Sequence, residues 1–366
     1  LLIALVLILI LVGAGVVEFL GRLPDRAGSV RPRAAATPTD LAEFSPPAAE
    51  RAPTPLFLPA GLQELLVRAR ASMMAAQWTD AAAAYTAVLE TQPTLLEALD
   101  ERGLAYGLQG ADEKARADWA RAVLQTPVDL RDYYYRGNAF LLLDRPAEAN
   151  RDFQFAASMQ PRDARDFCLR GLVHFCLREY RQAIKDYDQA IALAPDFARA
   201  FNNRGNAYSA LRLYDRAIAD YSAAVRLNPR FARAYVNLGD LYKASEWYDS
   251  AIRHYAEAIR ANPADAEAYD KRADAYRLLR EYASAVSDYN EAIRLRPGDA
   301  GLFCRRGKAY AGLHNDHRAL ADYDEAVRLD PNGRAAYVGR AAAYRALGQT
   351  RDAENDEATA RKLAGH

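Results

Sequence analysis

The chain of 366 residues carries 48 basic and 48 acidic side chains, and 51% of its residues are hydrophobic. Its formal net charge of zero argues against a nucleic-acid binder that works through a summed basic field, and its hydrophobic content excludes a disordered chain. The three cysteines exclude a disulfide scaffold and mildly favour a reducing compartment.

An uncharged segment opens the chain. Residues 1–17 contain no charged side chain and no hydroxyl group, and Glu18 is the first charge. A twenty-residue helix is about 30 Å long, which matches the hydrocarbon thickness of a bilayer. We therefore predict a transmembrane anchor helix over residues 1–20. A cleaved signal peptide, with Ala14 at a weak cleavage position, is the less favoured alternative because the apolar run is long.

The next segment changes in composition. It begins with four arginines, at Arg22, Arg26, Arg31 and Arg33. By the positive-inside rule they slightly favour the cytoplasmic side for the rest of the chain. Prolines recur through residues 21–61 among alanines and charges. Such a composition cannot bury a core, so we predict a semi-rigid linker over these residues.

A period of 34 residues dominates residues 62–366. Alanine recurs at this period from Ala81 to Ala353, and in eight of nine periods an aromatic residue follows four positions later. Glycine or alanine recurs from Ala69 to Ala341, and proline ends eight periods, at 93, 127, 161, 195, 229, 263, 297 and 331. Each period predicts a helical hairpin: small residues allow close helix approach, aromatics fill space between hairpins, and proline ends the second helix.

This pattern resembles the tetratricopeptide repeat. Residues 200–229, AFNNRGNAYSALRLYDRAIADYSAAVRLNP, match its signature almost throughout, and the resemblance covers nine repeats over residues 62–366. It implies an all-α, right-handed superhelical solenoid of helix-turn-helix repeats, here preceded by one transmembrane helix. One hairpin cannot bury its apolar faces alone, whereas stacked neighbours can.

Two charged positions follow the same period. Arginine occupies one of them in eight repeats and aspartate occupies the other in seven, whereas the repeat over residues 232–265 has Leu238 and His254 there. This joint absence predicts that each arginine pairs with the aspartate of its own hairpin. The predicted structural pairs include Arg136 with Asp152, Arg204 with Asp220, and Arg306 with Asp322. An exposed pair of this kind contributes about 0–1 kcal/mol.

The resemblance also implies an inner face lined by the first helix of each hairpin. Its lining is apolar in repeats one to four and polar in repeats five to eight. We hypothesise that repeats three and four bind an apolar or aromatic segment of a partner protein. The predicted groove residues are Tyr134, Tyr135, Leu141, Leu142, Cys168, Leu169, Leu172, Phe175 and Cys176. The alternative is that these residues pack within the array or against the chain's own linker.

The polar half of the inner face carries a second candidate site. Some tetratricopeptide domains clamp the terminal carboxylate of a peptide, and Asn206, Asn237 and Lys271 fall on three of their five clamp positions. Glu267 stands where a lysine is expected and would repel a carboxylate. A peptide-binding chaperone adaptor that uses such a clamp is the alternative function. A ladder of arginines at one position is interpreted as a solvated edge: Arg131, Arg165, Arg199 and Arg233.

No catalytic motif stands out from the period. The sequence contains no Walker loop, dinucleotide fingerprint, nucleophile elbow or zinc-spaced cysteine set. His314, Asp316 and His317 lie at a predicted turn, which is interpreted as solvated rather than metal-binding. We expect no enzyme activity, cofactor, metal, small-molecule substrate or nucleic acid. The predicted function is a membrane-anchored interaction scaffold, an assembly, stabilising or accessory subunit of a membrane protein complex.

Overall fold

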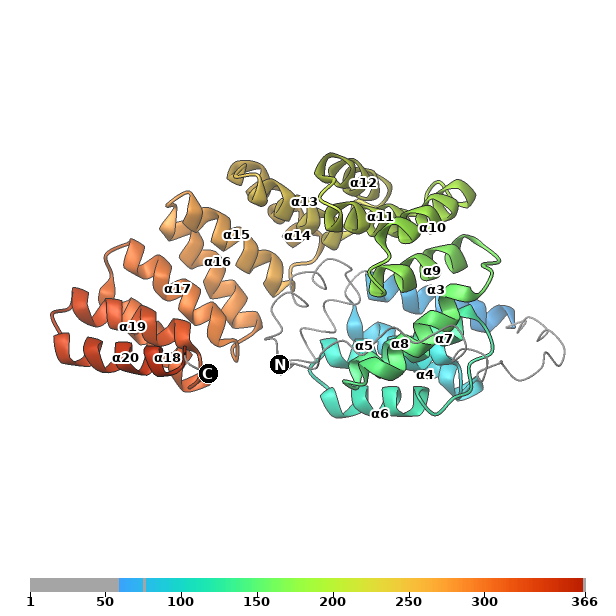
Figure 1. Cartoon of the computed structure of the whole chain (residues 1–366), viewed down its shortest axis with the longest axis horizontal. Helices are drawn as coiled ribbons and strands as arrows, with labels where there is room; N and C mark the ends of the chain where they lie inside the picture. The colour runs from blue at the N-terminus through green and yellow to red at the C-terminus, as the bar shows by residue number, and fades with distance from the viewer. Residues whose placement is uncertain (1–58, 75–76, 365–366) are drawn as a thin grey trace, which may run out of the picture. The chain divides into compact units, whose positions relative to one another are not determined.

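The computed structural model describes residues 59–74 and 77–364, which form eighteen α-helices and no strand (Figure 1). The helices pair into nine helix-turn-helix hairpins. The first helices are α3 (Ala60–Met74), α5 (Leu96–Leu108), α7 (Leu130–Leu142), α9 (Ala164–Cys176), α11 (Ala198–Ala210), α13 (Ala232–Ala244), α15 (Ala266–Leu278), α17 (Ala300–Gly312) and α19 (Arg334–Ala346). The second helices are α4 (Trp78–Thr91), α6 (Asp112–Ala122), α8 (Pro146–Ser158), α10 (Tyr180–Leu193), α12 (Tyr214–Leu227), α14 (Tyr248–Ala261), α16 (Tyr282–Leu295), α18 (Asp316–Leu329) and α20 (Thr350–Lys362).

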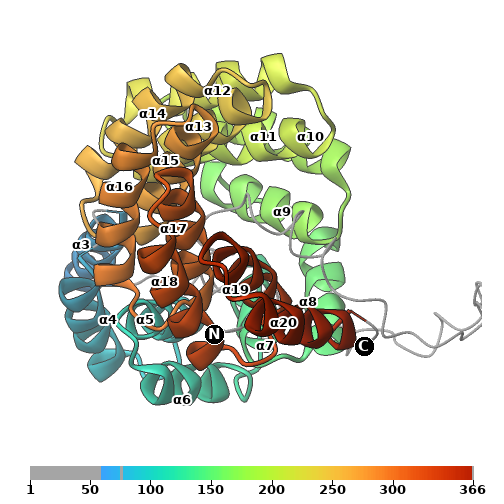
Figure 2. The ribbon, with the colours of Figure 1, turned by 90° about the vertical axis from the view of Figure 1, so that its left-hand side faces the viewer.

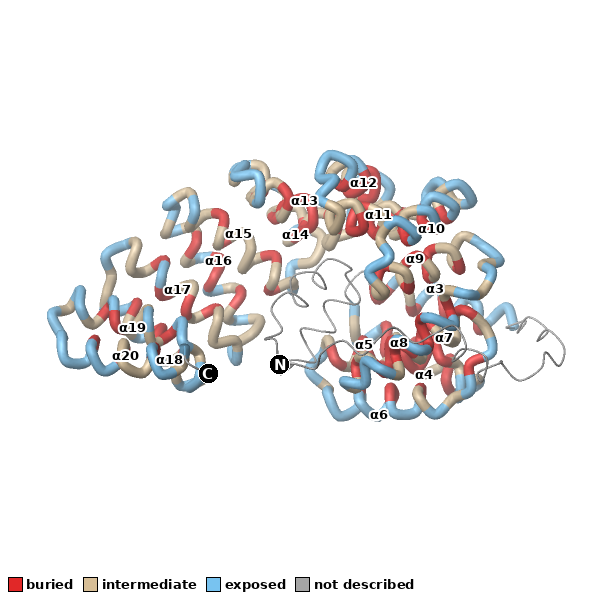
Figure 3. Tube along the Cα trace, in the orientation of Figure 1, coloured by how far each residue is buried: buried red, intermediate tan, exposed pale blue. Residues whose placement is uncertain are grey.

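The hairpin of α13 and α14 shows how the sequence sets the helix ends. Glu246, in the turn between the two helices, has a left-handed backbone with φ of 63°. Helix α14 ends at Ala261, and its C-cap residue Asn262 has the extended backbone (φ −141°, ψ 92°) that is favoured before proline. Pro263 then separates this hairpin from the next. Figure 3 shows that such turns are largely exposed, whereas buried stretches lie within the helices.

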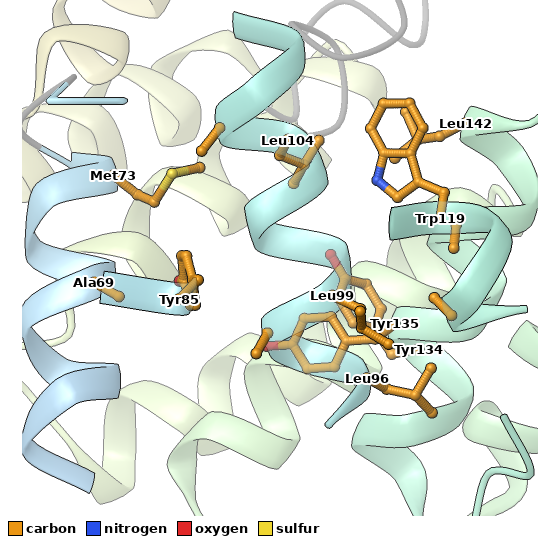
Figure 4. Close-up of a cluster of buried hydrophobic side chains, with 14 of the residues drawn as sticks. Ala69, Met73, Tyr85, Leu96, Leu99, Leu104, Trp119, Tyr134, Tyr135 and Leu142 are labelled. Carbon is orange, nitrogen blue, oxygen red and sulfur yellow. The ribbon is translucent and has the colours of Figure 1, made fainter. Parts of the chain in front are cut away.

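The described chain divides into two compact units. The first contains residues 59–195 and 206–211, and the second contains residues 196–205 and those after 211. The core of the first unit is one large apolar cluster from several helices; in Figure 4, Leu96 and Leu99 of α5 lie beside Tyr134 and Tyr135 of α7. The second unit has smaller clusters built mainly of alanine and tyrosine, and its hairpins from α13 to α20 follow one another in chain order (Figure 2).

In six hairpins the repeated aromatic ring lies against the glycine of the same hairpin. A Cβ atom added to Gly239 would lie 2.4 Å from the ring of Tyr255. One added to Gly171 would lie 2.5 Å from Tyr187. Glycine is therefore needed at these positions for the close approach of the two helices. Tyr323 also contacts Gly339 of the following repeat, so that its ring fills space between two hairpins.

The all-α array of paired helices that the period predicts is confirmed. The predicted anchor over residues 1–20 and nearly all of the linker over residues 21–61 lie outside the described residues, so these two segments stay predictions. In the ranges that the structure describes, no helix has the length and apolar character needed to cross a bilayer. The right-handed superhelical path also stays a prediction.

Candidate interaction surfaces

Seven hairpins hold an arginine and an aspartate side by side between their two helices. Arg204 donates from Nε to Asp220 Oδ2 at 2.8 Å and from Nη2 to Oδ1 at 2.7 Å. The structure brings the other two named pairs together in the same way, at 2.7 and 2.7 Å and at 2.9 and 2.6 Å: Arg136 with Asp152 and Arg306 with Asp322. The remaining pairs are Arg102 with Asp118, Arg170 with Asp186, Arg272 with Asp288, and Arg340 with Asp356.

These arginines also make contacts beyond the paired aspartate. Arg136 also donates from Nη1 to the backbone oxygen of Gln125 in the preceding repeat, at 3.1 Å. Its guanidinium lies over the ring of Tyr133, 5.7 Å from the centroid. The aspartate side chains of the seven pairs are only 5–8% exposed, so the range for an exposed pair does not describe them. We call this arrangement of arginine, aspartate and flanking ring the arginine staple.

The predicted apolar groove lies mostly inside the first unit. Six of its nine side chains are buried: Tyr134, Tyr135, Leu142, Cys168, Leu169 and Phe175. Leu141, Leu172 and Cys176 are half-buried. The physical reason is that the first helices of neighbouring repeats contact one another, α5 with α7 and α7 with α9. A partner lying on this face would meet only the half-buried residues directly, and partner binding itself stays a prediction.

A buried acid on α5 joins distant repeats. Glu97 Oε1 accepts from Arg70 Nε of α3 at 2.6 Å and from Arg165 Nη2 of α9. Arg165 also donates to the hydroxyl of Tyr135 at 2.8 Å. Burial alone would raise the pKa of Glu97, but Arg165 and Arg70 outweigh it and lower that pKa below its usual range. No pattern in the sequence singled out Glu97. The signal that was available is its negative charge at the position where Arg165 is positive two repeats later.

Asp100 lies one turn further along α5, and its pKa is shifted in the opposite direction. It is 1% exposed, and its Oδ2 accepts from Asn138 Nδ2 at 2.7 Å. Its Oδ1 has no hydrogen-bond partner among the described residues. Burial, the charge of Glu101 and, to a smaller extent, that of Glu97 raise the pKa of Asp100 well above its usual range, against the hydrogen bond from Asn138. The ionised form of the Asp100 carboxyl group is therefore unfavourable in the core of the first unit.

Replacing Asp100 with asparagine is expected to stabilise the first unit at neutral and higher pH by about 1–3 kcal/mol, because the amide needs no charge in the core. A raised folded-state pKa means that the wild-type protein loses stability as pH rises above about 4, the unfolded value. The gain should therefore shrink as pH falls to about 4. Urea unfolding of D100N and wild type across this range checks it, and a gain that grows on acidification contradicts it.

In the second unit, ion pairs join residues at the positions predicted to line the inner face. Lys271 Nζ lies 2.7 Å from Asp240 Oδ2 and 3.4 Å from Glu267 Oε1. Arg305 donates to both oxygens of Asp270, at 2.6 and 2.9 Å. Burial alone would lower the pKa of Lys271, yet Asp240 and Glu267 raise it above its usual range. This face therefore offers half-buried charges of both signs.

Two of the three predicted clamp residues are buried, and the third is engaged in ion pairs. Asn206 is 4% exposed in the first unit. Asn237 is buried and donates from Nδ2 to Asn202 Oδ1 at 2.9 Å. A peptide carboxylate would have to compete with the two carboxylates on Lys271. Glu267 stays ionised beside it, since Arg233 and Lys271 overcome the effect of burial and lower its pKa to about 2.

The predicted arginine ladder is not a solvated edge. Arg131 donates from Nε to Asp166 Oδ1 at 2.5 Å and from Nη2 to Asp163 Oδ2 at 2.6 Å. Arg165 binds Glu97, as described above, and Arg233 donates to Glu267 at 3.1 Å. The interpretation as a solvated edge was therefore wrong for these three residues, because carboxylates of the same unit neutralise them.

The histidine turn has a structural role in the hairpin. His314 adopts a left-handed backbone with φ of 57°, and Asn315 caps α18 by accepting from the backbone N–H of Arg318 at 3.2 Å. Both His314 and His317 are exposed. Within residues 59–74 and 77–364, no group of three or more histidine, cysteine or acidic side chains is placed to hold a metal ion.

The described residues form an array of paired helices whose hairpins share one period, and seven of these hairpins share the same arginine–aspartate contact. Models described as tetratricopeptide repeat match residues 198–231, 236–300 and 300–332, and one described as TPR repeat matches residues 171–211. The chain thus carries tetratricopeptide repeats over residues 171–231 and 236–332. Repeats of this family typically serve as non-catalytic scaffolds for protein–protein interaction. No curated protein matches the sequence.

The fold is similar to that in the crystal structure of the APC/C hetero-tetramer Cut9–Hcn1. The TM-score is 0.58 at 20% identity, over 78% of this chain and 57% of that chain. The likeness shows the fold alone, and this chain spans little more than half of that one. Shorter matches are YrrB, a TPR protein with an unusual peptide-binding site (24% identity, 50% and 95% covered, TM-score 0.43), and MamA (23% identity, 46% and 92% covered, TM-score 0.43).

Proposed function

We propose that this tetratricopeptide-repeat scaffold is tethered to a membrane and holds partner proteins there, as an assembly, stabilising or accessory subunit of a membrane complex. The scaffold part of the proposal is supported by two observations. All eighteen described helices belong to repeats, and Glu97, Glu267 and Lys271 of the predicted inner face are engaged in ion pairs. The right-handed superhelical path implied by the repeats is part of this proposal.

The inner faces of the two units support different kinds of contact. In the first unit, Leu141, Leu172 and Cys176 are half-buried and remain within reach of an apolar partner segment. In the second unit, Asp240, Lys271 and Arg305 are half-buried and charged. Polar groups that stay partly hydrated are suited to a partner that is bound and released, because removing their remaining water on binding costs less free energy.

Partner retention tests the apolar part of the proposal. Replacing Leu172 with aspartate should abolish co-purification of the partner from mild detergent, because a charge is then placed in the apolar contact. Leu193→Asp is the matched control, since Leu193 lies in the same unit but is 59% exposed at the end of α10. Phe175 is unsuitable because it is buried and its substitution would test folding. Equal recovery of the partner with L172D and with L193D, both giving wild-type circular dichroism, would defeat this assignment.

The anchor has an experiment of its own. Deleting residues 1–20 should move the protein from the membrane fraction to the soluble fraction. Sequencing the mature N-terminus distinguishes the anchor from a cleaved signal peptide, and protease protection in sealed vesicles tests the predicted cytoplasmic side. If the deletion is combined with L172D, so that the partner no longer retains the chain, an unchanged membrane fraction excludes the anchor.

A further inference from the structure

Repeat six, over residues 232–265, lacks the arginine staple but keeps its rings. Leu238 stands in place of the arginine and His254 in place of the aspartate. In repeats eight and nine the arginine lies over two rings, 5.4–5.9 Å from their centroids: Arg306 over Phe303 and Tyr310, and Arg340 over Tyr337 and Tyr344. The corresponding rings of repeat six are Tyr235 and Tyr242. Repeat six therefore keeps two aromatic positions that serve a cation elsewhere, without the arginine.

An aromatic stack replaces the cation in repeat six. The imidazole of His254 lies 5.1 Å from the Tyr242 ring, centroid to centroid, and 8° from parallel. The indole of Trp247 lies 6.0 Å from the same ring and 20° from parallel. Burial, and secondarily Arg253, lowers the pKa of His254, which favours the neutral imidazole. The stack is thus held in place by ring contacts.

One ring of this stack is open to solvent. Trp247 is 64% exposed, although it is stacked and forms the N-cap position of α14. Two acidic residues flank it, Glu246 directly before it and Asp249 two residues after. Both are exposed, and neither forms an ion pair with another residue in the described part of the chain. The nearby cation Arg253 donates to Ser250 Oγ at 3.0 Å.

We propose that repeat six receives an arginine side chain of a partner protein, which stacks on Trp247 and pairs with Glu246 and Asp249. An aromatic face beside a carboxylate is what seven other repeats use to hold their own arginine. A guanidinium fits better than an ammonium because it is planar, stacks on rings and binds carboxylates through a fork of N–H groups. The site lies on the turn between α13 and α14, so it adds a contact that the proposed inner-face function does not require.

The probe is the tripeptide acetyl-Gly-Arg-Gly-amide, with citrulline and lysine in place of arginine as comparison peptides. The full chain in detergent micelles is labelled with 5-fluorotryptophan, and the fluorine signal of Trp247 is assigned from W247F among Trp78, Trp119 and Trp247. The arginine peptide should shift this signal with a dissociation constant in the millimolar range, as expected for one exposed cation–π and ion-pair contact. Removing the acids together, E246Q with D249N, should weaken binding about threefold or more.

Asp215 provides the matched control, since it is exposed and occupies in repeat five the position of Asp249. D215N should leave the dissociation constant unchanged. The proposal is overturned if the Trp247 signal does not move, or if citrulline or lysine shifts it with the affinity of arginine. It is equally overturned if the double acid variant binds as wild type does. Each readout is independent of partner retention on the inner face.

Discussion

Replacing Asp288 with alanine is expected to destabilise the second unit by about 3 kcal/mol. Asp288 accepts two hydrogen bonds from Arg272, each 2.7 Å long, and the arginine side chain is only 19% exposed. Alanine would leave a guanidinium between helices with neither its counter-charge nor its hydrogen bonds. The cost comes mainly from this uncompensated charge rather than from the attraction that is lost.

Repeat six supplies the control for this experiment. The double variant R272L with D288H copies Leu238 and His254 into repeat seven and removes both charges together. It should cost less than about 1.5 kcal/mol, because no charge is stranded. Urea unfolding measured by circular dichroism gives the free energies, and hydrogen exchange in α15 and α16 locates the loss if the array unfolds in segments. Equal losses in D288A and in the double variant would show that the arginine staple does not act through charge compensation.

The repeat architecture could be predicted because several positions share one phase. Gly239, Tyr255 and Pro263 belong to different positions of the same period, and the structure assigns each a local task within or at the end of one hairpin. The proximity of each arginine to its aspartate also follows from one hairpin, since the two lie sixteen residues apart in adjacent helices. Contacts made within one hairpin can therefore be predicted from the positions that recur with the 34-residue period.

The burial and the ion pairing of the residues predicted to line the inner face could not be predicted in this way. Tyr134 and Leu142 are buried because neighbouring first helices contact one another, and the closeness of that contact depends on the angle between repeats. Glu97 pairs with Arg165 across 68 residues, which a pattern within one period cannot show. A comparison of charge signs at one position two repeats apart would have been the available signal.

Replacing Glu97 with glutamine is expected to destabilise the first unit by about 3 kcal/mol at neutral pH, since two half-buried arginines lose their shared carboxylate. The effect has a defined pH dependence. Because the pKa of Glu97 is lowered in the folded state, its contribution is complete above the unfolded value of about 4.3. It is lost as pH falls through the lower folded value, so the difference between wild type and E97Q should shrink on acidification.

The sign of this dependence separates Glu97 from Asp100, although both are buried on α5. Acid protonates Glu97 and so removes its stabilising charge. For Asp100, whose pKa is raised, protonation removes an unfavourable buried charge and so stabilises the fold. Urea unfolding of E97Q and D100N over the same pH series should therefore show a loss and a gain at neutral pH, both diminishing towards about pH 4 and below. Glu113→Gln, an exposed change on α6 of the same unit, should stay within about 0.5 kcal/mol of wild type throughout. A loss in E97Q that persists undiminished in acid would mean that the glutamate acts through packing, and that Arg70 and Arg165 do not depend on its charge.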